Sequence, residues 1–429
     1  MIFSFFYNTL LLLMTLVLFP KWGFDALFKK KYRQSWLERI GWKTISWKST
    51  DRRTAWFHAV SLGETKAIAS LVQRFHQAHP DWLIIISSGT ETGHAEAMRT
   101  IPYAEKHFYL PLDFSWVMKK LFGRVRPSLV VLSEGDLWYH FLYYAKMSQA
   151  KVAIVNAKLS ERSLKRMRWA SFFSARILKL IDLIVAQSRL YADRWVALGF
   201  PKEHLKVTGN LKFDGIGQPL SISELQGWRK KLLISPKDFV VTLGSTHAPE
   251  EIEFLQQMKI IWNKFPDAKV IIVPRHPERF DEVERIIQKE NISYCRYTGI
   301  EKQIDRTTRI ILLDAMGLLQ VCYQLSEVAV VGGSYVSHVG GHNILEPCVY
   351  GVPVLFGPYM HAQPEMASLA HQFQAGKKVA MNKLGFVIIG LLKDEERRKK
   401  IGQCGKKLIE QQRGATERTW QLIRDFFSL

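Results

Sequence analysis

The 429-residue chain lacks several features that mark common functional classes. It has only four cysteines, and none of them forms a Cys-x-x-Cys pair or stands beside a histidine at metal-ligand spacing. This indicates ordinary core thiols in a reducing compartment. No G-x-x-x-x-G-K-[ST] loop occurs, which argues against a P-loop nucleotidase. No Asp-x-Asp pair occurs either, so the usual Mg²⁺–diphosphate chelator of many sugar-nucleotide enzymes is missing.

Acidic residues are scarce relative to basic ones. The chain has 39 Asp and Glu against 60 Lys and Arg, a formal net charge of +21. Such an excess predicts an acidic partner, which could be nucleic acid, an anionic membrane surface or a phosphorylated substrate. No recognisable nucleic-acid module is present, which disfavours the first. The 13 tryptophans and 25 phenylalanines suit a membrane interface, although much of this aromatic content must belong to the core.

The first 19 residues lack any charge. A helix of that length spans about 28 Å, enough to cross a hydrocarbon core. The segment has neither the basic start nor the small-residue cleavage site of a signal peptide, so we expect an uncleaved anchor over residues 1–20. From Lys21 to Arg53 there are ten basic and three acidic residues, which predicts a cytoplasmic body. The basic run at 29–33 fits either headgroup binding or a solvated helix face.

Short apolar, β-branched runs alternate with helical patterns through the rest of the chain. Such strands, separated by helices, indicate parallel sheets covered on both faces, and two sets of them indicate two doubly wound α/β domains. The predicted strands are Thr54–Val60, Leu83–Ser88, Leu129–Ser133, Val152–Asn156 and Leu183–Ala186, then Phe239–Gly244, Lys269–Pro274, Arg309–Leu313, Val328–Val331 and Pro353–Phe356. A Gly/Pro-bearing stretch at 215–219 predicts the boundary, with domains at 21–215 and 216–429.

Carboxylates follow two predicted strands of the first half, where open α/β sheets bind ligands. The string HAVSLGE ends at Glu64, which is either a helix N-terminal charge or a general base. The string SEGDLW contains Glu134 and Asp136. Because Asp136 suits a helix N-cap, Glu134 is the better catalytic candidate.

Basic residues gather in two further segments of the first half. The string NAKLSERSLKRMRW begins at Asn156, and from Lys158 to Lys179 there are seven basic residues and one acidic residue. This segment fits either a solvated helix face or a contact with anionic lipid. The string VTGNLKFD places Lys212 near the predicted boundary, either as an ordinary surface lysine or as one that reaches a phosphate or carboxylate.

Small and cationic residues follow the predicted strands of the second half. Paired glycines occur in VGGS at 331–334 and in GGHNILEP at 340–347, and they let backbone amides approach a phosphate. Arg275 and His276 at a strand end suit a nucleotide, and Glu346 at a helix start can hold ribose hydroxyls. The strings GSTH at 244–247 and DAMG at 314–317 also follow strands.

Taken in order, these strings resemble the Kdo (3-deoxy-D-manno-octulosonic acid) transferases, which build the inner core of lipopolysaccharide. The resemblance covers nearly the whole chain. It implies a GT-B fold of two Rossmann-like domains, the first binding the acceptor and the second the CMP-sugar. It also implies CMP-Kdo as donor, lipid IV-A as acceptor, inversion at the anomeric centre, and one or several Kdo additions in succession. No cofactor or metal is expected, because lysine and arginine can manage a nucleoside monophosphate leaving group.

The resemblance also implies roles for individual residues. Glu64 matches the catalytic base, and Glu134 and Lys212 match positions that stabilise the transition state. The implied CMP site comprises Pro274, Arg275, Met316, Gly317, Leu318, Asn343, Ile344, Leu345 and Glu346. Two departures from the family pattern put one nucleotide contact and the wall beside Glu134 in doubt. They are Leu318 in place of a glutamate, and Gly135-Asp136 in place of Thr-Glu.

With the expected anchor, the resemblance predicts a bacterial inner-membrane protein whose catalytic body is cytoplasmic. Its predicted partners are CMP-Kdo, lipid IV-A and anionic membrane lipids, and not nucleic acid. Two alternatives remain open. A UDP-sugar transferase of the same fold would bind UDP in preference to CMP. A membrane-tethered nucleic-acid-binding protein, suggested only by charge, would bind duplex DNA at physiological salt.

Overall fold

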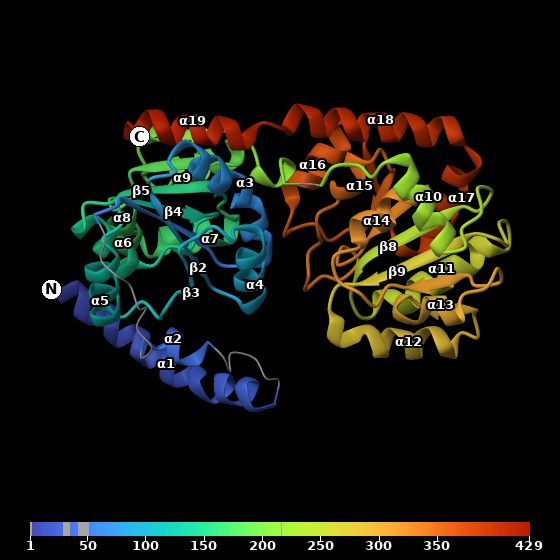
Figure 1. Ribbon diagram of the computed structural model, residues 1–429, viewed down its shortest axis with the longest axis horizontal. Helices are drawn as coiled ribbons and strands as arrows, with labels where there is room; N and C mark the ends of the chain where they lie inside the picture. The colour runs from blue at the N-terminus through green and yellow to red at the C-terminus, as the bar shows by residue number, and fades with distance from the viewer. Residues whose placement is uncertain (1, 29–34, 42–50, 216) are drawn as a thin grey trace. The chain divides into compact units, whose positions relative to one another are not determined.

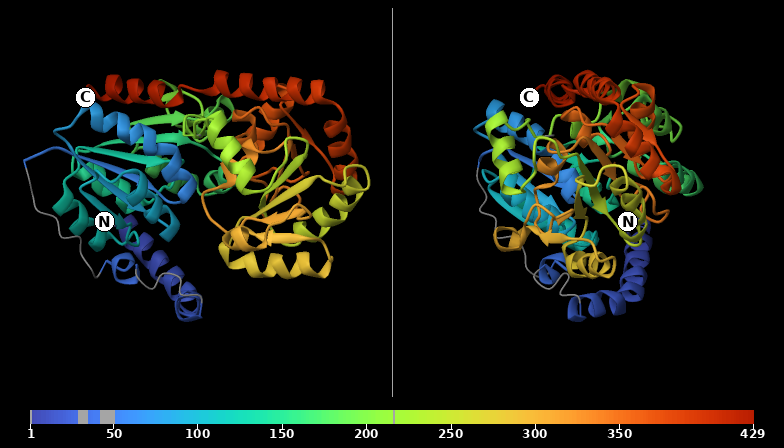
Figure 2. Two further views of the ribbon diagram at one scale, coloured as in Figure 1. Left: turned by 45° about the vertical axis from the view of Figure 1, so that its right-hand side comes forward. Right: turned by 90° about the vertical axis from the view of Figure 1, so that its right-hand side faces the viewer.

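The computed structural model describes residues 2–28, 35–41, 51–215 and 217–429 (Figures 1 and 2). The chain forms two compact α/β units, the first made of Met1–Gly215 with Gln412–Leu429 and the second of Ile216–Gln411. The basic run predicted at 29–33 lies outside the described residues.

The first unit contains a seven-stranded parallel sheet in the order β3-β2-β1-β4-β5-β6-β7. Its strands are β1 (Thr54–Ala59), β2 (Leu83–Ser88), β3 (Lys106–Tyr109), β4 (Leu129–Ser133), β5 (Lys151–Ala157), β6 (Leu183–Ala186) and β7 (Leu205–Val207). The strand order reverses between β1 and β4. That reversal is the switch point at which open α/β sheets bind ligands.

Helices cover both faces of this sheet because successive strand residues point to opposite sides. Phe57 faces a core shared with α3 (Leu62–Ala78), α4 (Glu91–Thr100) and α19 (Ala415–Phe427). Trp56 faces the opposite core, shared with α5 (Ser115–Val125), α6 (Tyr139–Met147) and α8 (Ser171–Leu178). The unit also contains α1 (Ile2–Phe28), α2 (Trp36–Arg39), α7 (Glu161–Trp169), α9 (Arg189–Val196), η1 (Lys202–His204) and η2 (Leu211–Phe213).

The second unit repeats this plan with a parallel sheet in the order β10-β11-β9-β8-β12-β13-β14, which reverses between β8 and β12. Its strands are β8 (Val240–Thr246), β9 (Lys269–Pro274), β10 (Tyr294–Arg296), β11 (Ile310–Leu312), β12 (Val328–Val331), β13 (Val354–Phe356) and β14 (Gly376–Lys378). One core involves α11 (Glu250–Trp262), α12 (Phe280–Lys289) and α17 (Leu384–Lys393), and the other α10 (Ile222–Lys231), α13 (Ile300–Gln303) and α14 (Leu319–Gln324). The remaining elements are η3 (Pro277–Arg279), η4 (Tyr297–Gly299), α15 (Glu346–Val349), α16 (Pro364–Gln372), η5 (Met381–Lys383) and α18 (Glu395–Gln412).

The prediction of two parallel-sheet α/β domains is confirmed. Each of the ten predicted strands is present, with ends that agree within two residues. The four strands that were not predicted, β3, β7, β10 and β14, form the edges of the two sheets. Edge strands here are only three or four residues long and partly exposed, so they lack the continuous apolar run that marks a buried strand.

The end of the chain differs from the prediction that 216–429 forms the second domain. Helix α19 belongs to the first unit, where Trp420, Ile423 and Phe427 join the core that contains α3. The ring centres of Phe75 in α3 and Trp420 in α19 are 5.7 Å apart. The helix therefore completes one covering layer of the first sheet, which its charged sequence pattern did not reveal.

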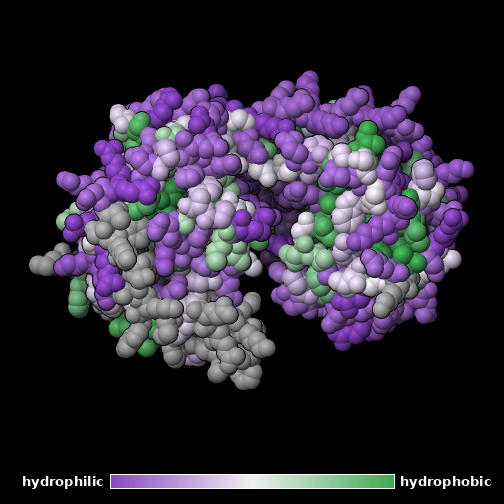
Figure 3. Space-filling view, viewed as in Figure 1, coloured by the Kyte–Doolittle hydropathy of each residue, from purple (hydrophilic) through white to green (hydrophobic). Residues whose placement is uncertain are grey.

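Helix α18 shows where part of the excess positive charge lies. Its exposed face is hydrophilic along the upper right of Figure 3. Lys399 forms an i,i+4 ion pair with Glu395, with an Nζ–Oε1 distance of 2.7 Å. This segment is a solvated helix face, so its charge says little about a specific partner.

Helix α1 packs on the first unit through polar contacts. The Tyr7 hydroxyl donates to Asp113 Oδ2 at 3.0 Å, and Asn8 Nδ2 donates to Ser115 Oγ at 2.8 Å. Ser4 Oγ lies 2.6 Å from His140 Nε2. Among the described residues, no helix is long and apolar enough to cross a membrane. The prediction of a transmembrane helix over residues 1–20 is therefore not supported.

Candidate active site

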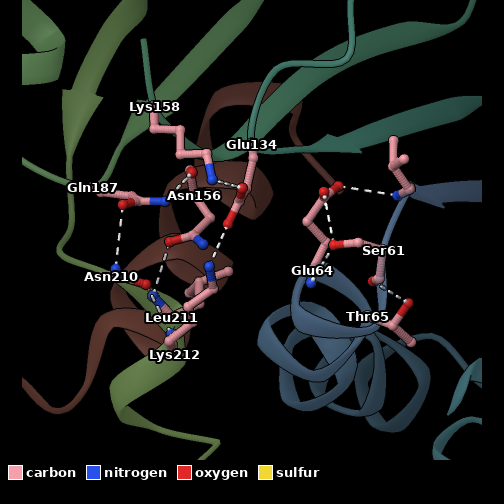
Figure 4. A network of polar contacts seen from close by, with 11 residues as sticks. Ser61, Glu64, Thr65, Glu134, Asn156, Lys158, Gln187, Asn210, Leu211 and Lys212 are labelled. Atoms are coloured by element: carbon pink, nitrogen blue, oxygen red, sulfur yellow. Dashed lines mark hydrogen bonds and ion pairs between the residues drawn. The ribbon is translucent and has the colours of Figure 1, made fainter. Parts of the chain in front are cut away.

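Two glutamates lie at the switch point of the first sheet. Glu64 is in the first turn of α3, whose N-cap is Ser61. Its carboxylate accepts hydrogen bonds from the Val60 N–H and the Ser61 hydroxyl, both at 3.0 Å (Figure 4). Glu134 directly follows β4 with a left-handed φ of 61°. Because β1 and β4 are parallel neighbours, both glutamates lie at the same edge of the sheet.

The surroundings of Glu64 favour its protonated form. Burial raises the pKa of Glu64 above 4.5, and the negative charge of Glu134 raises it further. The hydrogen bonds from Val60 and Ser61 and the charge of His58 oppose this rise without cancelling it. A carboxylate with a raised pKa is a stronger base, which suits proton abstraction near neutral pH. Glu64 thus occupies a helix N-terminus and also has the electrostatics of a base.

Glu134 lies between two lysines. Lys212 Nζ is 2.7 Å from Glu134 Oε1, and Lys158 Nζ pairs with Glu134 Oε2. Burial would raise the pKa of Glu134, but the two lysine charges outweigh it and the pKa is lowered. Both oxygens of this carboxylate are engaged in ion pairs, so Glu134 is a poor proton acceptor. The cluster carries a net charge of +1 at neutral pH.

A chain of amide side chains holds Lys212 in place (Figure 4). Asn210 Oδ1 accepts from the Lys212 N–H at 3.0 Å, and Asn210 Nδ2 donates to Gln187 Oε1 at 3.2 Å. Gln187 Nε2 donates to the Asn156 carbonyl at 2.8 Å, and Asn156 Oδ1 accepts from the Leu211 N–H at 3.0 Å. These bonds tie η2 to the ends of β5 and β6, so the position of Lys212 is set by the sheet.

The predicted nucleotide residues of the second unit also follow strands. Pro274 ends β9, and the Arg275 N–H donates to the Thr246 carbonyl at 3.1 Å. Met316, Gly317 and Leu318 form the loop between β11 and α14, and Met316 is 57% exposed. Because β9 and β11 are parallel neighbours, the loops that follow them lie at the same edge of the sheet.

The segment 343–346 leads into α15 and is fixed by its own side chains. Asn343 Oδ1 accepts from the Leu345 N–H at 3.1 Å, and Asn343 Nδ2 donates to Glu346 Oε1 at 3.3 Å. Ile344 and Leu345 are fully buried, so their side chains are not accessible to a ligand. Within the described part of the chain, no group of three or more His, Cys, Asp or Glu residues could hold a metal ion.

Comparison with known proteins assigns the family. A family model described as 3-Deoxy-D-manno-octulosonic-acid transferase (kdotransferase) matches residues 34–215. A 3-deoxy-D-manno-octulosonic acid transferase of Chlamydia muridarum is 33% identical, over 97% of this chain and 96% of the relative. The chain belongs to the Kdo transferase family. The corresponding protein of Haemophilus influenzae is 30% identical over 98% of both chains.

Two solved structures of other proteins share the overall fold of this Kdo transferase family member. A UDP-GlcNAc 2-epimerase from Neisseria meningitidis matches with a TM-score of 0.61 and 12% identity, over 87% of this chain and all of that one. A glycosyltransferase from Rickettsia africae matches with a TM-score of 0.60 and 12% identity, over 88% and 99% of the two chains. At these identities the likeness shows the GT-B-like fold alone.

Two residues near the site, Lys158 and Asp136, differ from what the sequence of this family member predicts. Lys158 directly follows β5, so the strand-end rule that selected Glu134 applied to it as well. In the sequence it stands out only as the first of the seven basic residues between 158 and 179. Asp136 does not cap a helix, because α6 begins at Tyr139 with Trp138 as its N-cap residue. Its carboxylate instead accepts from Trp138 Nε1 at 2.7 Å and lies 3.2 Å from His58 Nε2.

The basic segment after β5 forms α7 and α8 and contacts α1. Helix α7 has no buried residue, and Trp169 at its end is 92% exposed. The Arg176 guanidinium lies 4.7 Å from the ring centre of Phe3 in α1 and 4.4 Å from that of Phe172 in α8. Helix α8 therefore packs against the start of α1. We call the exposed residues of α1, α8 and the preceding α7 the α1/α8 surface.

Proposed function

We propose that this chain transfers Kdo from CMP-Kdo to a hydroxyl of lipid IV-A in one inverting displacement. One observation carries the proposal. Of the two glutamates at the switch point of the first unit, only Glu64 is available to accept a proton. Its pKa is raised, whereas Glu134 has a lowered pKa and is ion-paired at both oxygens. Membership of the Kdo transferase family supports the choice of sugar.

The proposed reaction accounts for the bond formed, the bond broken and the proton released. The acceptor oxygen attacks the anomeric carbon while the bond from that carbon to the phosphate oxygen breaks. The hydroxyl proton passes to Glu64, and the bonding electrons leave with CMP. Lys212 and Lys158, fixed by Glu134, supply positive charge that stabilises developing negative charge. Single displacement on one face of the sugar inverts the anomeric centre.

Comparing the binding of CMP, UMP and UDP tests whether the donor is a CMP-sugar. We expect purified protein to bind CMP and not UMP or UDP, through Arg275, Asn343 and Glu346 and the backbone beside them. Activity should persist in EDTA, because lysine and arginine can neutralise a monophosphate leaving group. Calorimetric titration with the three nucleotides measures the first expectation. Tighter binding of UDP than of CMP, or full loss of activity in EDTA, would contradict the donor assignment.

We also propose that the protein works on the cytoplasmic face of a bacterial inner membrane, with the α1/α8 surface against anionic lipid. Along α1, Phe5 and Phe6 are about two-thirds exposed, and Val17 is 78% exposed. Exposed Phe172 of α8 contacts Phe3 of the same helix α1. The preceding helix α7 ends in exposed Trp169 and carries the basic residues Arg162, Lys165, Arg166 and Arg168. Apolar side chains flanked by basic ones are typical of helices that lie in the membrane interface.

Vesicle binding tests this surface. Phe6→Asp should lower binding to anionic vesicles by more than about tenfold, because a buried phenyl ring contributes roughly 1.5–3 kcal/mol. Phe386→Asp in α17 is a matched control, since Phe6 is 65% and Phe386 66% exposed. Raising the salt concentration should release part of the bound wild-type protein. Equal binding by the two variants would show that α1 does not touch the lipid.

A further inference from the structure

Two loops meet at the switch point of the second sheet. His247 directly follows β8, and Gly332 and Gly333 directly follow β12, the neighbouring strand. The sheet order reverses between these strands, which is where open α/β sheets bind ligands. Ser245, at the end of β8, adopts a left-handed φ of 58°. Non-glycine residues in that region are costly and cluster at functional sites.

Two histidines from these loops form a pair. The Nε2 atoms of His247 and His342 are 2.7 Å apart, so one ring donates its N–H to the other. The rings are stacked, with centres 5.0 Å apart and planes at 19°. Gly333 makes room for the pair, because a Cβ at this position would lie 2.8 Å from His342 Cδ2. The ring of His276, which follows β9, is centred 5.1 Å from that of His247.

Glu250 forms hydrogen bonds with both the loop after β8 and the loop after β12. This residue is 1% exposed, and its carboxylate accepts three backbone N–H groups. The donors are His247 and Gly333, both at 2.8 Å, and Tyr335 at 3.0 Å. One side chain therefore joins the loop after β8 to the loop after β12, and it holds the backbone of His247 in place.

The electrostatic surroundings of the pair are positive. The pKa of His342 is lowered to about 3 and that of His247 to about 4, chiefly by burial, and the charges of His276 and Arg275 contribute to both shifts. The nearby carboxylates are already engaged, Glu250 by three N–H groups and Glu251 by Arg279, with an Nη1–Oε1 distance of 2.6 Å. Both imidazoles are therefore neutral at pH 7, in a field that attracts an anion.

We propose that His247 and His342 bind an anionic oxygen of the donor, either the nucleotide phosphate or the sugar carboxylate, and that Glu250 is the positioning residue for this site. The inference rests on the proposed function for the identity of the donor. A hydrogen bond from imidazole to a charged oxygen is about twice as strong as the neutral bond within the pair. The anion therefore replaces the Nε2–Nε2 bond favourably.

The affinities for CMP and cytidine, which differ only by the phosphate, test the site. If the pair holds the phosphate, His342→Ala and His247→Ala should each weaken CMP binding by about 10- to 100-fold in calorimetric titrations of the full chain, the loss expected for a hydrogen bond to a charged group. Cytidine affinity should stay within about twofold in the same variants, because the nucleoside lacks the charged oxygen. His371→Ala, at an exposed position in α16, is the control and should bind both as wild type does.

Kinetics with CMP-Kdo separate the two anionic groups. If the pair holds the phosphate, CMP affinity falls and KM for CMP-Kdo rises together. If it holds the sugar carboxylate, only KM for CMP-Kdo rises. Glu250→Gln should reproduce the same pattern with a smaller change in kcat than in KM, because its amide faces backbone donors and displaces the loops. Wild-type CMP affinity and wild-type KM in both folded histidine variants would overturn the proposal.

The two proposals fail in different ways. Wild-type protein that binds UMP in preference to CMP would refute the proposed donor. The histidine site would then be judged by the same comparison of UMP with uridine. Wild-type protein that prefers CMP, with histidine variants that keep the wild-type ratio of CMP to cytidine affinity and the wild-type KM, would refute the histidine site alone.

Discussion

The substitution Glu64→Gln is expected to lower kcat by about 10²–10⁴-fold while CMP binding survives, because a positioned general base contributes that much. Glutamine preserves the size of the side chain and can still accept one hydrogen bond from Val60 or Ser61. It cannot take the proton of the acceptor hydroxyl. Steady-state kinetics with CMP-Kdo and lipid IV-A, beside CMP calorimetry, measure the two effects.

The pH dependence of the same variant provides a second readout. The base acts only when ionised, so wild-type kcat should fall as the pH drops through a pKa above the ordinary value of 4.5. The residual activity of Glu64→Gln should lack this acid limb. Because the pKa of Glu64 is raised in the folded protein, ionisation of Glu64 lowers the stability of the fold. This loss develops as the pH rises from the unfolded-state pKa to the folded-state pKa. At neutral pH the neutral variant is therefore expected to unfold at the wild-type temperature or slightly above it.

Glu224→Gln is a matched control for the helix-capping role. Glu224 occupies the same place in α10 that Glu64 occupies in α3, three residues after an N-cap serine whose hydroxyl accepts its N–H. If the activity of the chain depended only on a capped helix, the two substitutions would behave alike. A wild-type rate in Glu64→Gln would place the base elsewhere, with Glu134 as the next candidate.

Glu134→Gln is expected to have the largest effect on stability. Glu134 is 6% exposed, and removing its charge leaves Lys158 and Lys212 close together without a counter-charge. Breaking a buried pair in this way costs roughly 3–5 kcal/mol, and the lower end applies because the Lys158 side chain is 43% exposed and can turn to solvent. Catalysis should fall as well, since Glu134 fixes the two cations.

Chemical denaturation over a range of pH checks this prediction. The pKa of Glu134 is lowered, so its stabilising effect is present above the unfolded-state pKa and is lost as pH falls through the folded-state pKa. The variant should therefore lose most stability at neutral pH and approach wild type in acid. Glu161→Gln, which breaks the exposed pair with Lys165, should change stability by less than about 1 kcal/mol. A Glu134 variant as stable as this control would show that the ion-pair cluster does not hold the site.

The buried strands could be predicted from sequence because their local pattern determines them. Strands such as β2 and β9 each contain a run of successive apolar residues, LIII and VIIV, and their predicted ends match the structure. The edge strands could not be predicted, since segments such as Gly376–Lys378 pair through the backbone and bury little. The rule that ligands bind at strand ends also led to Glu64 and Glu134, because that rule depends only on the order of strands.

Long-range contacts explain what the sequence left open. The first 19 residues are apolar enough to predict a membrane span, but hydropathy does not show that Tyr7 bonds to Asp113 and Asn8 to Ser115. The ion pair between Lys158 and Glu134 and the packing of α19 on the first unit likewise join distant positions. Nothing in the local sequence distinguishes these residues from ordinary surface lysines or a charged terminal helix.

Mass spectrometry of the transfer reaction tests the central claim most directly. Purified protein is incubated with CMP-Kdo and lipid IV-A, and the lipid product and the released nucleotide are both identified. The account predicts lipid IV-A heavier by one Kdo residue or a whole number of them, one CMP released for each, and almost no product from Glu64→Gln in the same time. Unmodified lipid IV-A with wild-type protein that binds CMP, or equal product from the variant, would contradict it.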